Sequence, residues 1–89
     1  MKSYFMPNVR MYSTHLCPYC MKAERLLNQK GAQVEKILVD TNPQEMEKMI
    51  EITGRRTVPQ IFIGDRHVGG YDDLVELDID GKLEPLLCQ

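Results

Sequence analysis

Two cysteines separated by two residues, Cys17 and Cys20, lie where the apolar periodicity of the chain changes from that of a strand to that of a helix. Over residues 9–13, Val, Met and Ser alternate with Arg and Tyr, which is typical of a short β-strand. Over residues 23–27, apolar side chains recur at spacings of three and four, which indicates an amphipathic helix. Pro18 suits the first turn of that helix, because proline has no N–H to donate there. This pattern predicts a strand that leads through a cysteine pair into a helix.

The remaining segments continue the alternation of strands and helices. Asn42, Pro43 and Glu45 resemble a capping box at the start of a second helix, and Gly54 marks its end. We predict strands at 34–39, 60–63 and 66–68, helices at 43–53 and 71–79, and a last apolar turn at 83–87. The order β-α-β-α-β-β-α predicts an α/β fold with a four-stranded mixed sheet flanked by helices on both faces.

Length and charge restrict the possible classes of protein. Eighty-nine residues support one small core, so we expect a single domain over residues 1–89, with residues 1–8 as a short leader. The net charge of −2 provides no global basic field, which argues against nucleic acid as the main partner. No apolar run approaches the roughly 20 residues of a membrane span, and the N-terminus lacks a secretory signal, so we expect a cytoplasmic protein with no membrane partner.

The cysteine pair predicts redox chemistry. At a helix N-terminus, Cys17 faces unpaired N–H groups and the positive end of the helix dipole, and both favour the thiolate over the thiol. Cys20 lies one turn inward, shielded from attack but able to close a disulfide. We therefore expect Cys17 to be the nucleophile and Cys20 to be the resolving thiol. Two alternatives stay open: buried structural cysteines, and a zinc site in which His15 and the pair are completed by His67 or Cys88.

Three motifs follow one another along the chain: Cys17-Pro18-Tyr19-Cys20, then Thr57-Val58-Pro59, then Gly69-Gly70-Tyr71-Asp72-Asp73-Leu74. In this order and spacing, over about residues 9–87, they resemble the dithiol glutaredoxins, most closely the small bacterial type. The resemblance implies a thioredoxin-like fold and a glutathione-dependent thiol–disulfide oxidoreductase that reduces glutathione mixed disulfides and protein disulfides. Glutathione is then a co-substrate, and no cofactor is tightly bound. The expected partners are glutathione and glutathionylated or disulfide-containing proteins, and the protein is expected to be a monomer.

The resemblance also implies how glutathione is bound. The bond before Pro59 is expected to be cis, with the backbone of Val58 turned toward the tripeptide. The N–H groups of Asp72 and Asp73 would hold the γ-glutamyl carboxylate, since a helix N-terminus favours anions, and the Asp72 side chain would accept from the ammonium group. The ring of Tyr19 would flank the ligand. The expected glutathione-binding residues are Tyr19, Arg56, Thr57, Val58, Pro59, Gly70, Tyr71, Asp72 and Asp73.

The carboxylate at the glycine end of glutathione requires a cation, and here the chain departs from similar proteins. They often have a lysine three residues before the first cysteine, where this chain has Thr14. Arg55, Arg56 and His15 are the candidates to replace that lysine, and we favour Arg56.

Two other functions share this fold. A thioredoxin-like reductant served by a flavoprotein reductase is disfavoured, because the chain has no Trp, which thioredoxins usually carry before the first cysteine. An iron–sulfur carrier is disfavoured by Pro18, since relatives that hold a cluster mostly have Gly or Ser there. Outside the motifs, we expect His67 to be exposed on a hairpin. We expect Cys88 to point outward or sideways as a passive thiol, with glutathionylation or dimer formation under oxidation as the alternative.

Overall fold

The computed structural model describes residues 7–88, so most of the expected leader lies outside the described residues. The elements follow one another as β1 (Val9–Ser13), α1 (Pro18–Gln29), β2 (Val34–Leu38), α2 (Pro43–Thr53), β3 (Gln60–Ile63), β4 (Arg66–Gly69), α3 (Tyr71–Ile79) and α4 (Leu83–Leu87). The expected order is confirmed, and the apolar turn near the end of the chain is the short helix α4.

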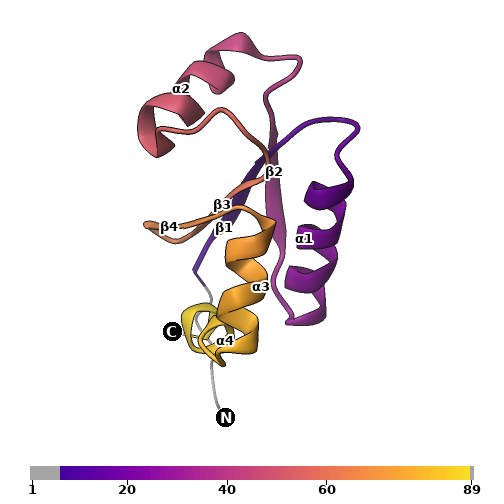
Figure 1. The fold of residues 1–89 in the computed structure, drawn as a ribbon, viewed down its shortest axis with the longest axis vertical. Helices are drawn as coiled ribbons and strands as arrows, with labels where there is room; N and C mark the ends of the chain where they lie inside the picture. Colours follow the sequence, from indigo (N-terminus) through magenta and orange to yellow (C-terminus); the bar gives the residue numbers. More distant parts are fainter. Residues whose placement is uncertain (1–6, 89) are drawn as a thin grey trace.

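The four strands form one mixed sheet in the order β2-β1-β3-β4. β1 runs parallel to β2 and antiparallel to β3, and β4 runs antiparallel to β3. Figure 1 shows α1 and α3 together on one side of the sheet and α2 away from them on the other. This arrangement is the mixed α/β architecture expected from the sequence.

Two apolar clusters occupy the two faces of the sheet. The larger lies against α1, α3 and α4 and includes Met11, Ala23, Leu27, Ile61, Leu74, Leu83 and Leu87. The smaller lies against α2 and consists of Tyr12, Val39, Met49 and Phe62. Along β1, Met11 enters the first cluster and Tyr12 the second, because successive residues of a strand point to opposite faces. β1 is therefore packed on both faces, and the loop toward Cys17 leaves from a firmly held strand.

The helix ends follow the expected signals with one exception. Pro18 and Pro43 lie in the first turns of α1 and α2, and Gly54 ends α2 with a φ of 72°. Asn42 occupies the N-cap position of α2, but its side chain makes no capping hydrogen bond, so the expected capping box is wrong. In a capping box the side chain of Asn42 would accept a hydrogen bond from the N–H of Glu45. That N–H donates instead to the backbone carbonyl of Asn42 at 3.1 Å.

At the end of the described chain, α4 packs through Leu83 and Leu87, both fully buried. Cys88 follows as an exposed free cysteine, as expected. None of the helices within residues 7–88 has the length and apolar character needed to cross a membrane.

Candidate active site

The cysteine pair lies where β1 leads into α1. Cys17 is the N-cap residue of α1, and its Sγ accepts a hydrogen bond from the N–H of Cys20 at 3.1 Å. A disulfide joins the two residues, and their exposed fractions are only 8% and 4%. The first turn of α1 contains no acidic residue. The position expected for Cys17 at a helix start is confirmed, and negative charge on its sulfur would face N–H groups with no carboxylate in that turn to oppose it.

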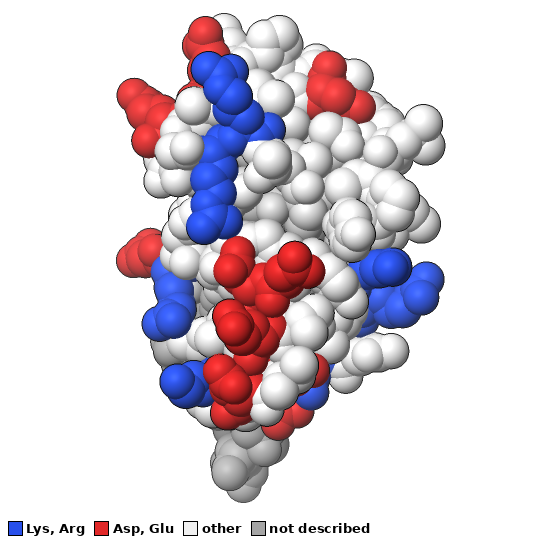
Figure 2. All heavy atoms as spheres, in the orientation of Figure 1, with Lys and Arg blue, Asp and Glu red and all other residues white. Residues whose placement is uncertain are grey.

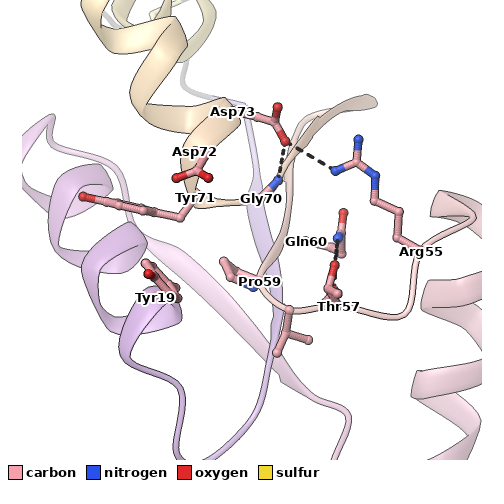
Figure 3. A pocket seen from close by; sticks show the side chains of 10 residues that line it. Tyr19, Arg55, Thr57, Pro59, Gln60, Gly70, Tyr71, Asp72 and Asp73 are labelled. Atoms are coloured by element: carbon pink, nitrogen blue, oxygen red, sulfur yellow. Dashed lines mark hydrogen bonds and ion pairs between the residues drawn. The ribbon is translucent and has the colours of Figure 1, made fainter.

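A pocket of about 350 Å³ lies beside the pair and is built from three segments: the first turn of α1, the chain that leads from α2 into β3, and the start of α3 (Figure 3). Its lining residues are Tyr19, Arg55, Thr57, Val58, Pro59, Gln60, Gly70, Tyr71, Asp72 and Asp73. All of the expected glutathione-binding residues except Arg56 are among them. The cysteines are not part of this lining, and Cys20 contributes instead to a separate pocket that also contains Ser13 and His15.

The middle wall of the pocket is the turn that enters β3. The Val58–Pro59 peptide bond is cis, as expected. Gln60 spans the turn, because its Nε2 donates to the carbonyl of Thr57 at 3.0 Å and to the Thr57 Oγ1 at 3.2 Å. Among residues 7–88, no hydrogen bond uses the N–H or C=O of Val58. The backbone of Val58 is therefore available to a ligand.

The third wall is the start of α3, where one carboxylate is already engaged. Oδ2 of Asp73 accepts the N–H of Gly70 at 2.9 Å and lies 3.3 Å from the guanidinium Nη1 of Arg55. The Gly70 N–H, and after it Arg55, hold the pKa of Asp73 below its ordinary value against the opposing effect of burial. A Cβ on Gly69, which has a φ of 115°, would overlap this carboxylate. Asp72 is exposed and has no partner among residues 7–88, so its side chain can take a ligand cation.

Two aromatic rings close the end of the pocket nearest the cysteines. The ring centroids of Tyr19 and Tyr71 are 5.9 Å apart, with an angle of 37° between the planes. The Lys22 ammonium lies 5.4 Å from the centroid of Tyr19, whose exposed fraction is 57%. Figure 3 shows both side chains across the pocket from Arg55. The rings can therefore flank one end of a ligand while the arginine attracts the other.

The three candidate cations lie at different places around the pocket. Both arginines are exposed, but Arg55 lines the pocket and Arg56 does not. His15 lies at the separate pocket and pairs with Asp40, its Nδ1 3.0 Å from Oδ2. Thr14 also lines that separate pocket. Neighbouring residues outside a helix project in different directions, so two consecutive arginines could not be told apart from their order alone.

Sequence alone did not identify Gln60 as a residue of the pocket, and it placed the neighbouring His67 on the surface. Gln60 was not expected to take part, although a polar residue at the start of an apolar strand is a signal that could have identified it. His67 was expected to be exposed, but it is half-buried, stacked on Phe62 with 4.9 Å between ring centroids. Its Nε2 lies 2.8 Å from Oε1 of Gln60. Burial, and after it Arg55, lowers the pKa of His67, while Asp73 opposes the shift.

Charge around the pocket is of both signs. Figure 2 shows acidic side chains gathered over α3 and basic side chains on either side of them. The acidic residues of α3 are Asp72, Asp73, Glu76 and Asp78. A rim of mixed charge suits a ligand that carries both carboxylates and an ammonium group. Within residues 7–88, no three His, Cys, Asp or Glu side chains come together as a metal site, and His15 pairs with Asp40.

Comparison with known proteins agrees with the site. Residues 9–68 match the family model described as Glutaredoxin. The chain is 49% identical to Glutaredoxin 3 of Escherichia coli (strain K12) over 82 residues, which cover 92% of this chain and 99% of that protein. It is 46% identical to Glutaredoxin of Neisseria meningitidis (serogroup A) over 83 residues, which cover 92% of this chain and 98% of that protein.

Solved structures confirm the thioredoxin-like fold expected from the resemblance. The solution structure of Glutaredoxin from Brucella melitensis has a TM-score of 0.82 and 47% identity, covering 93% of this chain and 90% of that one. The crystal structure of the buckwheat glutaredoxin–glutathione complex has a TM-score of 0.84 and 36% identity, covering 91% and 76%. With its cysteine pair at the start of α1 and relatives that match almost end to end, the chain belongs to the glutaredoxin family of thiol–disulfide oxidoreductases.

Proposed function

We propose that this glutathione-dependent oxidoreductase carries out its exchange at Cys17, with Cys20 as the resolving thiol. The observation that carries the proposal is the N-cap position of Cys17, whose sulfur accepts a backbone N–H at the start of α1. This position favours the thiolate, which is the reactive form of a cysteine, in the reduced protein.

With a glutathione mixed disulfide, the reaction needs Cys17 alone. Its thiolate attacks the glutathionyl sulfur, so a bond forms between Cys17 and glutathione while the substrate thiolate leaves and takes a proton from water. A second glutathione thiolate then attacks the sulfur of the bound glutathione. Glutathione disulfide leaves, and the Cys17 thiolate is restored. The helix N-terminus stabilises Cys17 both as the attacking group and as the leaving group.

With a protein disulfide, Cys20 completes the reaction. Cys17 attacks one substrate sulfur and forms a mixed disulfide between the two proteins. Cys20, one turn further along α1, attacks the Cys17 sulfur, releases the reduced substrate and closes the Cys17–Cys20 disulfide. Two glutathione molecules then reduce the pair and leave as glutathione disulfide.

Glutathione would lie across the pocket with each of its charged groups opposed. The backbone of Val58 pairs with the cysteinyl residue of the tripeptide, next to Thr57 and Pro59. The N–H groups at the start of α3 hold the γ-glutamyl carboxylate, and Asp72 accepts from the ammonium group. Arg55 attracts the carboxylate at the glycine end, and Tyr19 and Tyr71 flank the ligand.

Thiol exchange of this kind needs no metal or flavin on the chain, so we propose glutathione as a co-substrate without a tightly bound cofactor. The other partners proposed are glutathionylated and disulfide-containing proteins, with neither nucleic acid nor membrane. We further propose a single-domain monomer that acts in the cytoplasm, by analogy with the small bacterial glutaredoxins that the chain matches.

Turnover of a small glutathione mixed disulfide by glutathione, NADPH and glutathione reductase tests the assignment. Cys17→Ser should abolish turnover, because the attacking sulfur is lost. Cys20→Ser should retain it, because external glutathione resolves the intermediate, yet should lose reduction of protein disulfides. An active Cys17→Ser together with an inactive Cys20→Ser would reverse the two roles.

A further inference from the structure

Hydrogen bonds link three polar side chains at the middle wall of the pocket: the half-buried His67, the buried Gln60 and the exposed Thr57. Gln60, with an exposed fraction of 1%, donates both hydrogens of its amide to Thr57, one to the carbonyl and one to the hydroxyl. Its Oε1 faces Nε2 of His67 at 2.8 Å. These hydrogen bonds thus connect β4, through β3, to the turn that carries Val58.

The donor and the acceptor of each of these hydrogen bonds follow from which atoms can donate and which can only accept. The carbonyl of Thr57 can only accept, so the amide nitrogen of Gln60 must face it. Oε1 of Gln60 is then directed at the ring of His67 and can also only accept. His67 must therefore carry its proton on Nε2. Stacking on Phe62 holds the ring in this place.

The Thr57–Val58 peptide transmits this arrangement to the pocket. The peptide is trans, since the cis bond of this turn is the one that follows. In a trans peptide the C=O of one residue and the N–H of the next point in opposite directions. When Gln60 holds the carbonyl of Thr57, the N–H of Val58 is therefore aimed away from Gln60, where no hydrogen bond within residues 7–88 uses it.

We propose that His67, acting through Gln60, is a positioning residue for glutathione. His67 fixes the amide of Gln60, Gln60 fixes the Thr57 carbonyl, and the N–H of Val58 is thereby presented to the cysteinyl part of the ligand. This role rests on the proposed function, because it concerns the same pocket. His67 does not line that pocket, so it acts on the ligand through Gln60 and the Thr57–Val58 peptide.

His67→Phe tests the role while preserving a ring against Phe62. It removes the donor and leaves Oε1 of Gln60 buried without a partner, so the KM for a small glutathione mixed disulfide should rise by about threefold to tenfold. The kcat and the rate of Cys17 alkylation should stay near those of the unchanged protein, because α1 is not altered. His67→Gln, which restores an N–H donor, should recover most of the lost affinity. Arg66→Gln, on the exposed preceding residue of β4, is the matched control and should not change KM.

A double-variant cycle separates action through Gln60 from independent effects. If His67 acts through Gln60, then His67→Phe should raise KM no further in a protein that already carries Gln60→Leu. If the fold increases in KM caused by His67→Phe and Gln60→Leu multiply in the double variant, the proposal is wrong. An unchanged KM for His67→Phe while the unchanged protein turns over glutathione mixed disulfides would also overturn it. Absence of turnover by the unchanged protein would overturn the proposed function itself.

A measurement that needs no variant keeps the proposal testable if His67→Phe does not fold. The ¹⁵N chemical shifts of the His67 ring at neutral pH should be those of the Nε2–H tautomer. Shifts of the Nδ1–H tautomer would contradict the hydrogen bond to Gln60 and with it the proposal.

Discussion

Ser13, the last residue of β1, is 1% exposed, and its Oγ has no hydrogen-bond partner among residues 7–88. A buried hydroxyl group that loses its water without gaining a partner costs about 1–3 kcal/mol. We therefore expect Ser13→Ala to raise the free energy of unfolding by about 1 kcal/mol. Thr53→Val is the matched comparison, because Thr53 Oγ1 donates to the Met49 carbonyl at 2.7 Å, and its loss should be destabilising. Urea unfolding of the oxidised protein measures the free energy of unfolding of both variants. A decrease in Ser13→Ala would mean that the Ser13 hydroxyl has a hydrogen-bond partner in solution.

The two consecutive arginines provide a direct test of the pocket. Arg55→Ala should raise the KM for a glutathione mixed disulfide by about threefold, and more at low salt, because a partly exposed ion pair is worth under about 1 kcal/mol. Arg56→Ala is the matched control, because it removes the same charge from a residue that does not line the pocket, and it should leave KM nearly unchanged. Steady-state kinetics at two ionic strengths distinguish them. A larger effect of Arg56→Ala would mean that Arg56, the residue favoured in the sequence analysis, binds the carboxylate at the glycine end of glutathione.

Among the helices, the start of α2 offers a test of capping. Asn42→Ala should lower the free energy of unfolding by less than about 0.5 kcal/mol, whereas a capping side chain is typically worth about 1 kcal/mol. The reason is that Asn42 makes no side-chain hydrogen bond there. At the other end of α2, Gly54→Ala should cost about 1 kcal/mol, because a φ of 72° is unfavourable for any residue with a Cβ. Equal losses for the two variants in thermal unfolding would show that Asn42 caps the helix in solution.

The elements were largely predictable from local signals, because apolar periodicity, Pro18 and Gly54 act within one or two turns of chain. The cysteine pair could be placed at a helix start for the same reason. What the sequence could not provide depends on contacts between distant segments. Arg55 contacts the carboxylate of Asp73 across 18 residues of sequence, and His67 is half-buried against Gln60 and Phe62 on the neighbouring strand.

At the scale of the whole molecule, Lys30 joins the end of α1 to both C-terminal helices. Its Nζ lies 2.9 Å from Asp78 of α3 and 3.2 Å from Glu84 of α4. Hydrogen bonds to Asp78 and then Glu84 raise the pKa of Lys30 above its ordinary 10.5. A raised pKa stabilises the fold fully below the unfolded value, and the contribution is lost only as the pH rises through the folded value. Lys30 therefore stays charged at neutral pH, and its own contribution to stability is lost in strong alkali.

Lys30→Met should loosen α4 without disturbing the active site. Hydrogen exchange of the α4 amides at neutral pH should accelerate by at least about threefold, because the side chain no longer holds Glu84. Lys82→Met removes a neighbouring exposed lysine with no ion pair among residues 7–88 and serves as the control. Unchanged α4 exchange in Lys30→Met would show that Leu83 and Leu87 hold the helix by themselves.

The pocket draws its walls from residues 17–20, 55–60 and 70–73, which are distant along the chain. Because the chain is made from its N-terminus, the two cysteines and the start of α1 are synthesised before the residues of the other two walls. A chain that has not yet formed those two walls has the cysteine pair but no pocket beside it. The pocket proposed for glutathione exists only after β3 has paired with β1 and α3 has packed against α1. Reactivity is thus encoded locally and early, whereas discrimination between thiols is a property of the finished fold.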